Sequence, residues 1–325
     1  MKKLKTIFFF NVLIIFSILL IAEFVSKFIE NRELCNMWKI QNPEMFSDKD
    51  IFKTLGYVQI QPFDYEKIVM SEVRGISQGT NANKRPVITI GDSYTYGSNL
   101  DKRQTFAEKI SKYTGRTTYN RGVSGTGPQM VYRQLIDKDF KKQIPDAEYI
   151  IYVLLSEDSI YRQFLYSKCG LHYNKVIPKY VIKNNKLAED NFLWYKLLFF
   201  SLGRRILVLK SKRDSYYEAM GNLPLFFKTM EECVNAVNMN YKNAKFVLLE
   251  MTHPLISDED KEKNEPLNKK MIKRLEKMGI IYINAEELVG HDFNDVKKYR
   301  VADKDHPNEL MWDEIVPKLS EKLNL

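Results

Sequence analysis

Short apolar runs alternate with amphipathic stretches along most of this chain. Four apolar runs have the length and β-branched content of buried strands and centre near residues 87, 149, 246 and 280, and residues 117–120 form a further short strand pattern. Each leads into a helical pattern, either directly or through a loop; Phe106, Ile110 and Tyr113, for example, keep helical spacing until Gly115. This alternation predicts a three-layer α/β domain around a parallel sheet of five strands.

The alternation is interrupted between about residues 166 and 225, which we interpret as an inserted subdomain. Residues 175–187, with Asn184-Asn185 at their centre, have the pattern of a β-hairpin. An aromatic-rich run over residues 192–202 is too short to span a bilayer. Such a run is usually core, although the basic residues after it favour a position on the bilayer surface, and a roof over the active site is a third alternative. Further helices are expected over residues 229–241, from Asn264-Glu265-Pro266 to about Gly279, and over residues 309–323.

The N-terminal residues have the pattern of a membrane anchor. Lysines at positions 2, 3 and 5 precede an almost continuous apolar run from residue 7 to residue 25. About 20 apolar residues cross a bilayer, and lysines before the run favour a cytoplasmic N-terminus. Because no small-residue cleavage site follows Ala22, we expect an uncleaved signal anchor rather than a removed signal peptide. The predicted organisation is an anchor over residues 1–30, an approach segment over 31–84 and an α/β domain over 85–325.

Composition narrows the class of partner. The 325 residues carry a net charge of +9, but the lysines are scattered among acidic residues and form no arginine-rich stripe. We therefore expect no nucleic-acid partner, and diffuse positive charge suits an anionic membrane or cell-wall surface better. Cys35, Cys169 and Cys233 form no CxxC motif or Cys/His cluster, so no metal is expected; whether two of them pair is left open. The glycines at 122, 125 and 127 run in the reverse of dinucleotide-binding spacing, and no cofactor is expected.

Two short motifs near opposite ends of the domain carry the candidate chemistry. The strand near residue 87 breaks at Gly91-Asp92-Ser93, and a serine just past the carboxyl end of a parallel strand lies where open α/β sheets bind ligands. Asp303 and His306 are three residues apart, so that one loop can hold the carboxylate against the imidazole. Together these residues supply a nucleophile, Ser93, and an oriented general base.

In this order and strand–turn–helix context, the two motifs resemble those of the SGNH (GDSL-type) hydrolase superfamily, in a membrane-anchored bacterial branch. The resemblance covers roughly residues 85–135, 146–165 and 244–322. It implies a flavodoxin-like strand order and a catalytic triad of Ser93, His306 and Asp303. It also implies an oxyanion hole formed by the backbone N–H groups of Ser93 and Gly125, although the loop containing Gly125 is alternatively a simple turn.

The chain departs from the superfamily at the third motif, which should read Gly-x-Asn-Asp. The sequence here is Ser156-Glu157-Asp158, with Glu157 at the asparagine position, and an ionised carboxylate cannot donate a hydrogen bond to an oxyanion. Arg162, one helical turn beyond Asp158, is expected to pair with Asp158; binding an anionic substrate group is the alternative. His253, after the strand near residue 246, lies on the cleft side of the sheet or is an ordinary loop residue.

These inferences predict a membrane-anchored serine esterase or O-acyl(acetyl)transferase with its catalytic domain outside the cytoplasm. Its expected substrate is an acylated envelope polysaccharide or peptidoglycan, and a transferase would need an acyl donor such as a membrane acyltransferase partner. The alternative is a catalytically weak or inactive glycan-binding or assembly protein on the same scaffold, which Glu157 favours.

Overall fold

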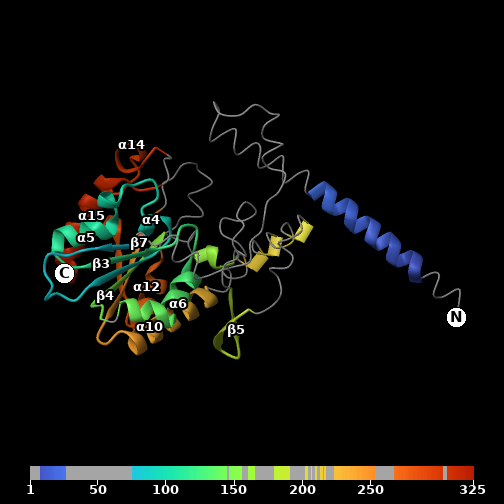
Figure 1. Ribbon diagram of the computed structural model, residues 1–325, viewed down its shortest axis with the longest axis horizontal. Coiled ribbons are helices and arrows are strands. Elements are labelled where there is room, and N and C mark those ends of the chain that lie inside the picture. Colours follow the sequence, from blue (N-terminus) through green and yellow to red (C-terminus); the bar gives the residue numbers. More distant parts are fainter. Residues whose placement is uncertain are drawn as a thin grey trace. The chain divides into compact units, whose positions relative to one another are not determined.

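The computed structural model describes residues 8–26, 75–144, 146–155, 160–164, 179–190, 223–252, 267–302 and 306–325, with scattered positions between 202 and 216 (Figure 1). The chain forms two compact units. One contains the N-terminal helix and the described positions from 202 to 214, and the other contains the central sheet with its helices. The candidate active site lies entirely within the second unit.

A six-stranded sheet forms the centre of the second unit, in the order β1-β3-β2-β4-β7-β8. All neighbouring strands are parallel except β1, which pairs antiparallel with β3 at the edge. The strands are β1 (Gly75–Ser77), β2 (Val87–Gly91), β3 (Thr118–Gly122), β4 (Tyr149–Leu155), β7 (Lys245–Met251) and β8 (Ile281–Asn284). The five parallel strands, numbered along the chain, stand in the order 2-1-3-4-5, which is the flavodoxin-like order.

The five parallel strands are those expected from the sequence, so the predicted fold class is confirmed. The additional strand β1 lies within residues 31–84, which the sequence analysis interprets as an approach segment. Three residues without an apolar run give no strand signal of their own, and β1 forms only as an addition to the edge of β3.

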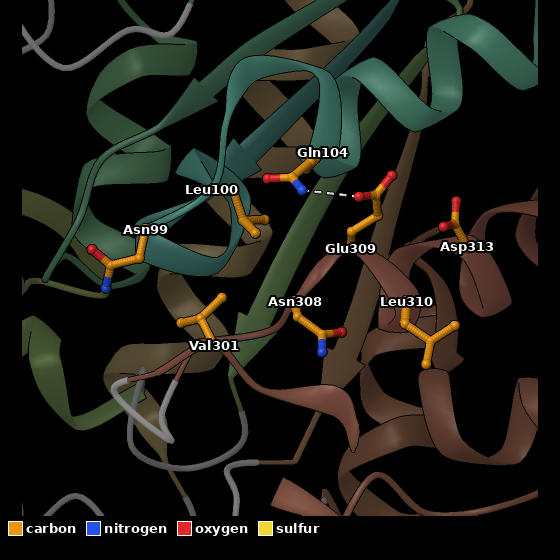
Figure 2. Close-up of a pocket in the computed structure, with 8 residues that line it drawn as sticks. All are labelled: Asn99, Leu100, Gln104, Val301, Asn308, Glu309, Leu310 and Asp313. Atoms are coloured by element: carbon orange, nitrogen blue, oxygen red, sulfur yellow. Dashed lines mark hydrogen bonds between the residues drawn. The ribbon is translucent and has the colours of Figure 1, made fainter. Parts of the chain in front are cut away.

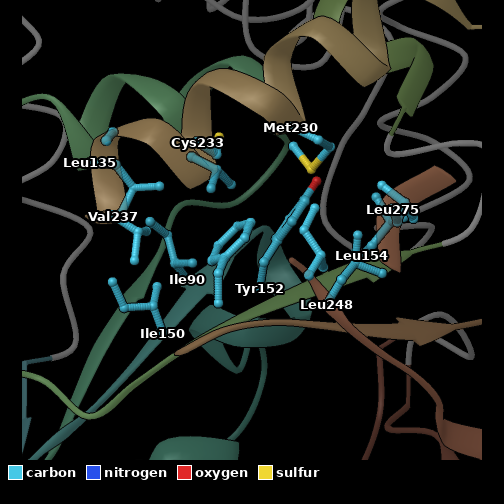
Figure 3. Close-up of a cluster of buried hydrophobic side chains, with 14 of the residues drawn as sticks. Ile90, Leu135, Ile150, Tyr152, Leu154, Met230, Cys233, Val237, Leu248 and Leu275 are labelled. Atoms are coloured by element: carbon cyan, nitrogen blue, oxygen red, sulfur yellow. The ribbon is translucent and has the colours of Figure 1, made fainter. Parts of the chain in front are cut away.

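Helices cover both faces of the sheet, as Figure 1 shows. Side chains along β2 alternate between two apolar cores, with Ile88 and Ile90 on one face and Val87 on the other. The first core packs against α6 and α10, and Figure 3 shows Ile90 and Tyr152 beneath Met230 of α10. The second packs against α5 and α15. The helices are α5 (Phe106–Thr114), α6 (Pro128–Leu135), α7 (Lys138–Gln143), α10 (Pro224–Asn240), α12 (Lys269–Lys277), α13 (Ala285–Val289), α14 (Val296–Tyr299) and α15 (Glu309–Leu323).

Two predicted helix starts are wrong, each for a local reason. Helix α12 begins at Lys269 instead of near Pro266, because the side chain of Asn268 accepts hydrogen bonds from the first-turn N–H groups and sets the start there. Helix α10 begins at Pro224, five residues before the predicted start, since proline is well suited to the first helical turn.

The predicted hairpin is present but begins later than expected, as β5 (Tyr180–Lys183) and β6 (Lys186–Glu189). Asn184 and Asn185 form its turn with φ values of 50° and 58°. Both central residues are left-handed, as a two-residue hairpin turn requires, and asparagine tolerates that conformation.

Among the described residues of the first unit, the helix over Phe8–Ser26 is strongly apolar and long enough to cross a membrane. Its bounds agree with the apolar run predicted from the sequence. Glu23, the acidic residue near its end, accepts a hydrogen bond of 2.9 Å from the backbone N–H of Leu202. This segment is either a membrane anchor or a signal sequence.

Candidate active site

Ser93 occupies the first position of the short helix α4 (Ser93–Tyr96), directly beyond the carboxyl end of β2. Asp92 caps this helix, and its Oδ1 accepts a hydrogen bond of 3.0 Å from the backbone N–H of Tyr94. The Ser93 residue is 8% exposed. The strand-to-helix turn expected at Gly91-Asp92-Ser93 is therefore present. It places Ser93 at the carboxyl ends of the parallel strands, where sheets of this kind bind ligands.

The end of β3 supports this turn from one side. A Cβ on Gly122 would lie 2.2 Å from the backbone nitrogen of Tyr96, so only glycine lets α4 approach β3 this closely. Beyond Gly122, the N–H of Val123 donates to the carbonyl oxygen of Gly91 at 2.8 Å. These contacts fix the chain that leads from β3 into the loop of Gly125.

Gly125 has a φ of 70°, a left-handed conformation that favours glycine. Its neighbour Ser124 is linked by a hydroxyl hydrogen bond of 3.3 Å to Ser98, and the N–H of Ser98 donates to the carbonyl oxygen of Ser93 at 3.0 Å. The loops that carry Gly125 and Ser93 are thus joined.

His306 lies in a chain reversal that leads into α15. The N–H of Val301 donates to the carbonyl oxygen of His306 at 3.0 Å, and the N–H of Asn308 donates to that of Tyr299 at 2.9 Å. Asn308 then caps α15 through the N–H of Met311. These hydrogen bonds place His306 at a defined position immediately before the last helix.

The reversal packs against the helix that begins with Ser93. The ring centroids of His306 and Tyr94 are 5.8 Å apart, and the Arg300 guanidinium donates a hydrogen bond of 2.9 Å to the Tyr94 hydroxyl. Arg300 and Tyr94 are both buried. Two segments more than 200 residues apart in sequence therefore meet at the carboxyl ends of the parallel strands, beside Ser93.

Several predicted residues fall outside the described parts of the chain. Asp303 lies in one such gap and Glu157 and Asp158 in another, so the acid of the triad and the third motif stay predictions. His253 also lies outside the described residues. Among the described residues, no group of three or more His, Cys, Asp or Glu side chains is arranged to hold a metal ion.

Arg162 has a partner that the sequence analysis did not anticipate. Its Nη1 lies 2.8 Å from Oδ2 of Asp92, with the two side chains 19% and 2% exposed. Gln129 holds the backbone of Arg162 by donating to its carbonyl oxygen at 3.1 Å. The expected partner Asp158 is a local one, whereas Asp92 is 70 positions away, a separation that helical spacing cannot reveal. Arg162 therefore binds the residue that precedes the candidate nucleophile.

An open pocket of about 560 Å³ lies between the segment that follows Ser93 and the segment around His306 (Figure 2). Asn99, Leu100 and Gln104 contribute one wall, and Val301 and the first turn of α15 contribute the other. Gln104 and Glu309 are hydrogen-bonded across it at 2.9 Å. The sequence analysis did not identify this pocket, because its walls come together only in the folded chain.

No family model matches this sequence, and no curated protein matches it either. Several solved structures are similar to it. One is a lipolytic protein of the G-D-S-L family from Desulfitobacterium hafniense, with 11% identity, 73% of this chain and 99% of that chain covered, and a TM-score of 0.42.

Two further structures are similar at comparable levels. The lipase Lip_vut3 from a goat rumen metagenome is 14% identical to this chain, with a TM-score of 0.44. The match covers 73% of this chain and 97% of the lipase chain. A carbohydrate esterase family 2 enzyme from Corynascus thermopiles (Myceliophthora fergusii) is 14% identical to this chain, with a TM-score of 0.38. The match covers 75% of this chain and 68% of the esterase chain.

Proposed function

We propose that this protein is a serine esterase or O-acyltransferase in which Ser93 is the nucleophile and His306 the general base. The observation that carries the proposal is the contact between Tyr94 and His306. It brings the helix that begins with Ser93 against the chain reversal that contains His306. Both lie at the carboxyl ends of the parallel strands, where ligands bind in such sheets. A hydroxyl beside an imidazole is the arrangement that acyl transfer needs.

In the proposed reaction, Oγ of Ser93 attacks the ester carbonyl carbon while His306 takes the hydroxyl proton. The resulting oxyanion accepts hydrogen bonds from the backbone N–H groups of Ser93 and Gly125. The bond to the alcohol then breaks, His306 returns the proton to the alcohol, and an acyl-enzyme remains. Water or a sugar hydroxyl attacks the acyl-enzyme in the same way, which completes hydrolysis or transfer. Asp303 orients the imidazole in this scheme.

The proposed substrate is an acylated glycan of the cell envelope, with acetyl as the expected acyl group. Support comes from the apolar helix Phe8–Ser26, preceded by lysines, which favours a catalytic domain outside the cytoplasm. A transferase would take its acyl group from a donor such as a membrane acyltransferase. Acetate release, compared with acetyl transfer to an added glycan, distinguishes hydrolysis from transfer.

The first prediction concerns Ser93 itself. Purified full-length protein in detergent should hydrolyse acetyl esters and should be labelled at Ser93 by a fluorophosphonate, which reacts with activated serines. Because no other group forms the acyl-enzyme, Ser93→Ala should abolish both signals. Ser320→Ala is the matched control, since Ser320 is a buried serine near the far end of α15 and should keep both signals.

Two outcomes would contradict the proposal. Full esterase activity in Ser93→Ala would exclude the named nucleophile. Absence of activity and of labelling in the wild type would favour the alternative function, an envelope glycan-binding or assembly protein, for which Glu157 at the asparagine position is the supporting observation.

A further inference from the structure

The pocket in Figure 2 adjoins the segments that hold the proposed nucleophile and base. On one side, the N–H of Ser98 donates to the carbonyl oxygen of Ser93, and Asn99 is the next residue. On the other side, the N–H of Val301 donates to the carbonyl oxygen of His306. A group bound in the pocket would therefore lie beside the proposed site of acyl transfer.

The walls of the pocket combine hydrogen-bonding and aliphatic side chains. Three amides and two carboxylates alternate with three aliphatic groups: Asn99, Gln104, Asn308, Glu309, Asp313, Leu100, Val301 and Leu310. The side-chain amides of Gln104 and Asn308 are hydrogen-bonded within the chain. The wall can therefore bind ligand hydroxyl groups through the Asn99 amide, which donates and accepts, and through the carboxylate oxygens, which accept. The aliphatic groups offer a surface to the C–H face of a ring.

The polar groups of the wall are held in place before any ligand binds. Lys109, whose side chain is only 10% exposed, contacts Glu309 at 2.5 Å and Asp313 at 2.8 Å. Gln104 donates to the other oxygen of Glu309, while its own oxygen accepts the N–H of Asp101 at 3.0 Å. A preorganised wall loses less conformational entropy when it binds a ligand.

Charge on the wall argues against an anionic ligand. The hydrogen bonds from Lys109 and Gln104 hold the pKa of Glu309 below its ordinary value, so this carboxyl stays ionised. Lys109 serves both carboxylates and lies beneath them, so a phosphate or carboxylate group would meet negative oxygens first. A neutral ligand with many hydroxyl groups meets no such repulsion.

We propose that this pocket is the subsite for an uncharged saccharide unit of the substrate, bound next to the ester that Ser93 attacks. The inference rests on the proposed function and adds the part of the substrate that determines specificity. The pocket volume falls within the range of small-molecule sites, which is about 300–1,000 Å³. Asn99, Leu310 and Asp313 are the groups that contact the sugar.

Asn99 offers a clean test because its φ is 62°, a conformation that glycine adopts freely. Asn99→Gly therefore removes the amide without straining the backbone. Asn243→Gly is the matched control, since Asn243 has a φ of 59° and lies in the turn before β7, at the amino ends of the parallel strands. Leu310→Trp, which fills the pocket, is paired with Met239→Trp on the exposed face of α10.

Full-length variants in detergent are compared on two esters: 4-nitrophenyl acetate, which has no sugar, and an O-acetylated N-acetylglucosamine trisaccharide. Loss of one hydrogen bond to the sugar should lower the ratio of the two kcat/KM values, sugar ester over nitrophenyl ester, by about five- to tenfold in Asn99→Gly. Leu310→Trp should lower it at least as much. Both control variants should keep the wild-type ratio.

NMR can follow binding of the N-acetylglucosamine trisaccharide without O-acetyl groups to the Ser93→Ala protein. This measurement separates the saccharide subsite from the esterase proposal. If esters are hydrolysed but Asn99→Gly and Leu310→Trp keep the wild-type ratio and binding, the subsite is wrong and the esterase stands. If the trisaccharide binds and Asn99→Gly weakens it while neither ester reacts, the subsite stands and the esterase is wrong. An unaltered trisaccharide spectrum in the presence of the protein would contradict the subsite directly.

Discussion

At the scale of single residues, Asp92 links the candidate nucleophile to the rest of the domain. One of its oxygens caps the helix that starts at Ser93, and the other binds the guanidinium of Arg162. Its carboxylate is almost fully buried, and a buried carboxylate without a cation is costly. The position of Ser93 therefore depends on Arg162, even though the two residues come from different strand ends.

A double-mutant comparison tests this dependence. Arg162→Gln should lower the free energy of unfolding by about 2–4 kcal/mol, because it removes the guanidinium charge from the almost fully buried Asp92 carboxylate. The double variant Asp92→Asn/Arg162→Gln should recover most of this loss, since the amide introduced in place of the carboxylate carries no charge and can still accept the N–H of Tyr94. Urea unfolding measures both effects. A double variant as unstable as Arg162→Gln would show that Arg162 stabilises the fold through other contacts.

The same residues show where sequence reasoning ends. Gly91-Asp92-Ser93 could be interpreted locally, because a strand followed by a glycine turn and a capping aspartate is a short-range pattern. The partner of Arg162 could not, because it depends on how the connection after β4 returns to the end of β2. Tertiary contacts of long charged side chains leave no periodic signal in the sequence.

At the scale of elements, two carboxyl groups interact where β7 ends and α13 begins. Glu250 is fully buried and accepts hydrogen bonds from the Leu267 N–H and the Tyr282 hydroxyl. Glu286, in the first turn of α13, interacts with Glu250 and is hydrogen-bonded to Thr252. Burial, and then the charge of Glu250, raise the pKa of Glu286 to about 7.

This pKa has a defined consequence for stability. A carboxyl that ionises near pH 7 in the folded chain and near pH 4.5 in the unfolded chain holds its proton only in the folded state between these values. The free energy of unfolding should therefore fall as the pH rises from about 4.5 to 7. Glu286→Gln should remove the part of this fall that Glu286 contributes, making the variant more stable than the wild type by about 1–2 kcal/mol at pH 8 and equal to it near pH 4. Burial also raises the pKa of Glu250, so a smaller fall should remain. Chemical unfolding across this pH range, with the exposed Glu287→Gln as control, checks it; a gain that persists at pH 4 would contradict the assignment.

Elements with a strong apolar pattern were predicted with their order and type. The helix over Glu309–Leu323 has the expected bounds, because Asn308 caps its start, and the strand over Lys245–Met251 contains the run expected near residue 246. Errors arose where two start signals compete, as between Pro266 and Asn268, or where an element is made by its neighbour, as β1 is by β3. The pocket beside Ser93 belongs to this second kind, since no single segment encodes it.

At the scale of the whole molecule, the apolar helix Phe8–Ser26 is long enough to be a membrane anchor or a signal sequence. We predict that it is an uncleaved anchor, because the apolar run reaches Glu23 without a small-residue cleavage site. Protein purified from the membrane fraction should then have the mass of the full chain, and deletion of residues 2–26 should release it into the soluble fraction, since about 20 buried apolar residues supply the attachment. An accessible cysteine introduced at the exposed Lys186 should react with an impermeant maleimide in intact cells, whereas one introduced at Lys3 should react only after lysis. A mature mass short of the first 20 to 30 residues would instead identify a signal peptide, and a reversed labelling pattern would place the catalytic domain in the cytoplasm, away from any envelope glycan.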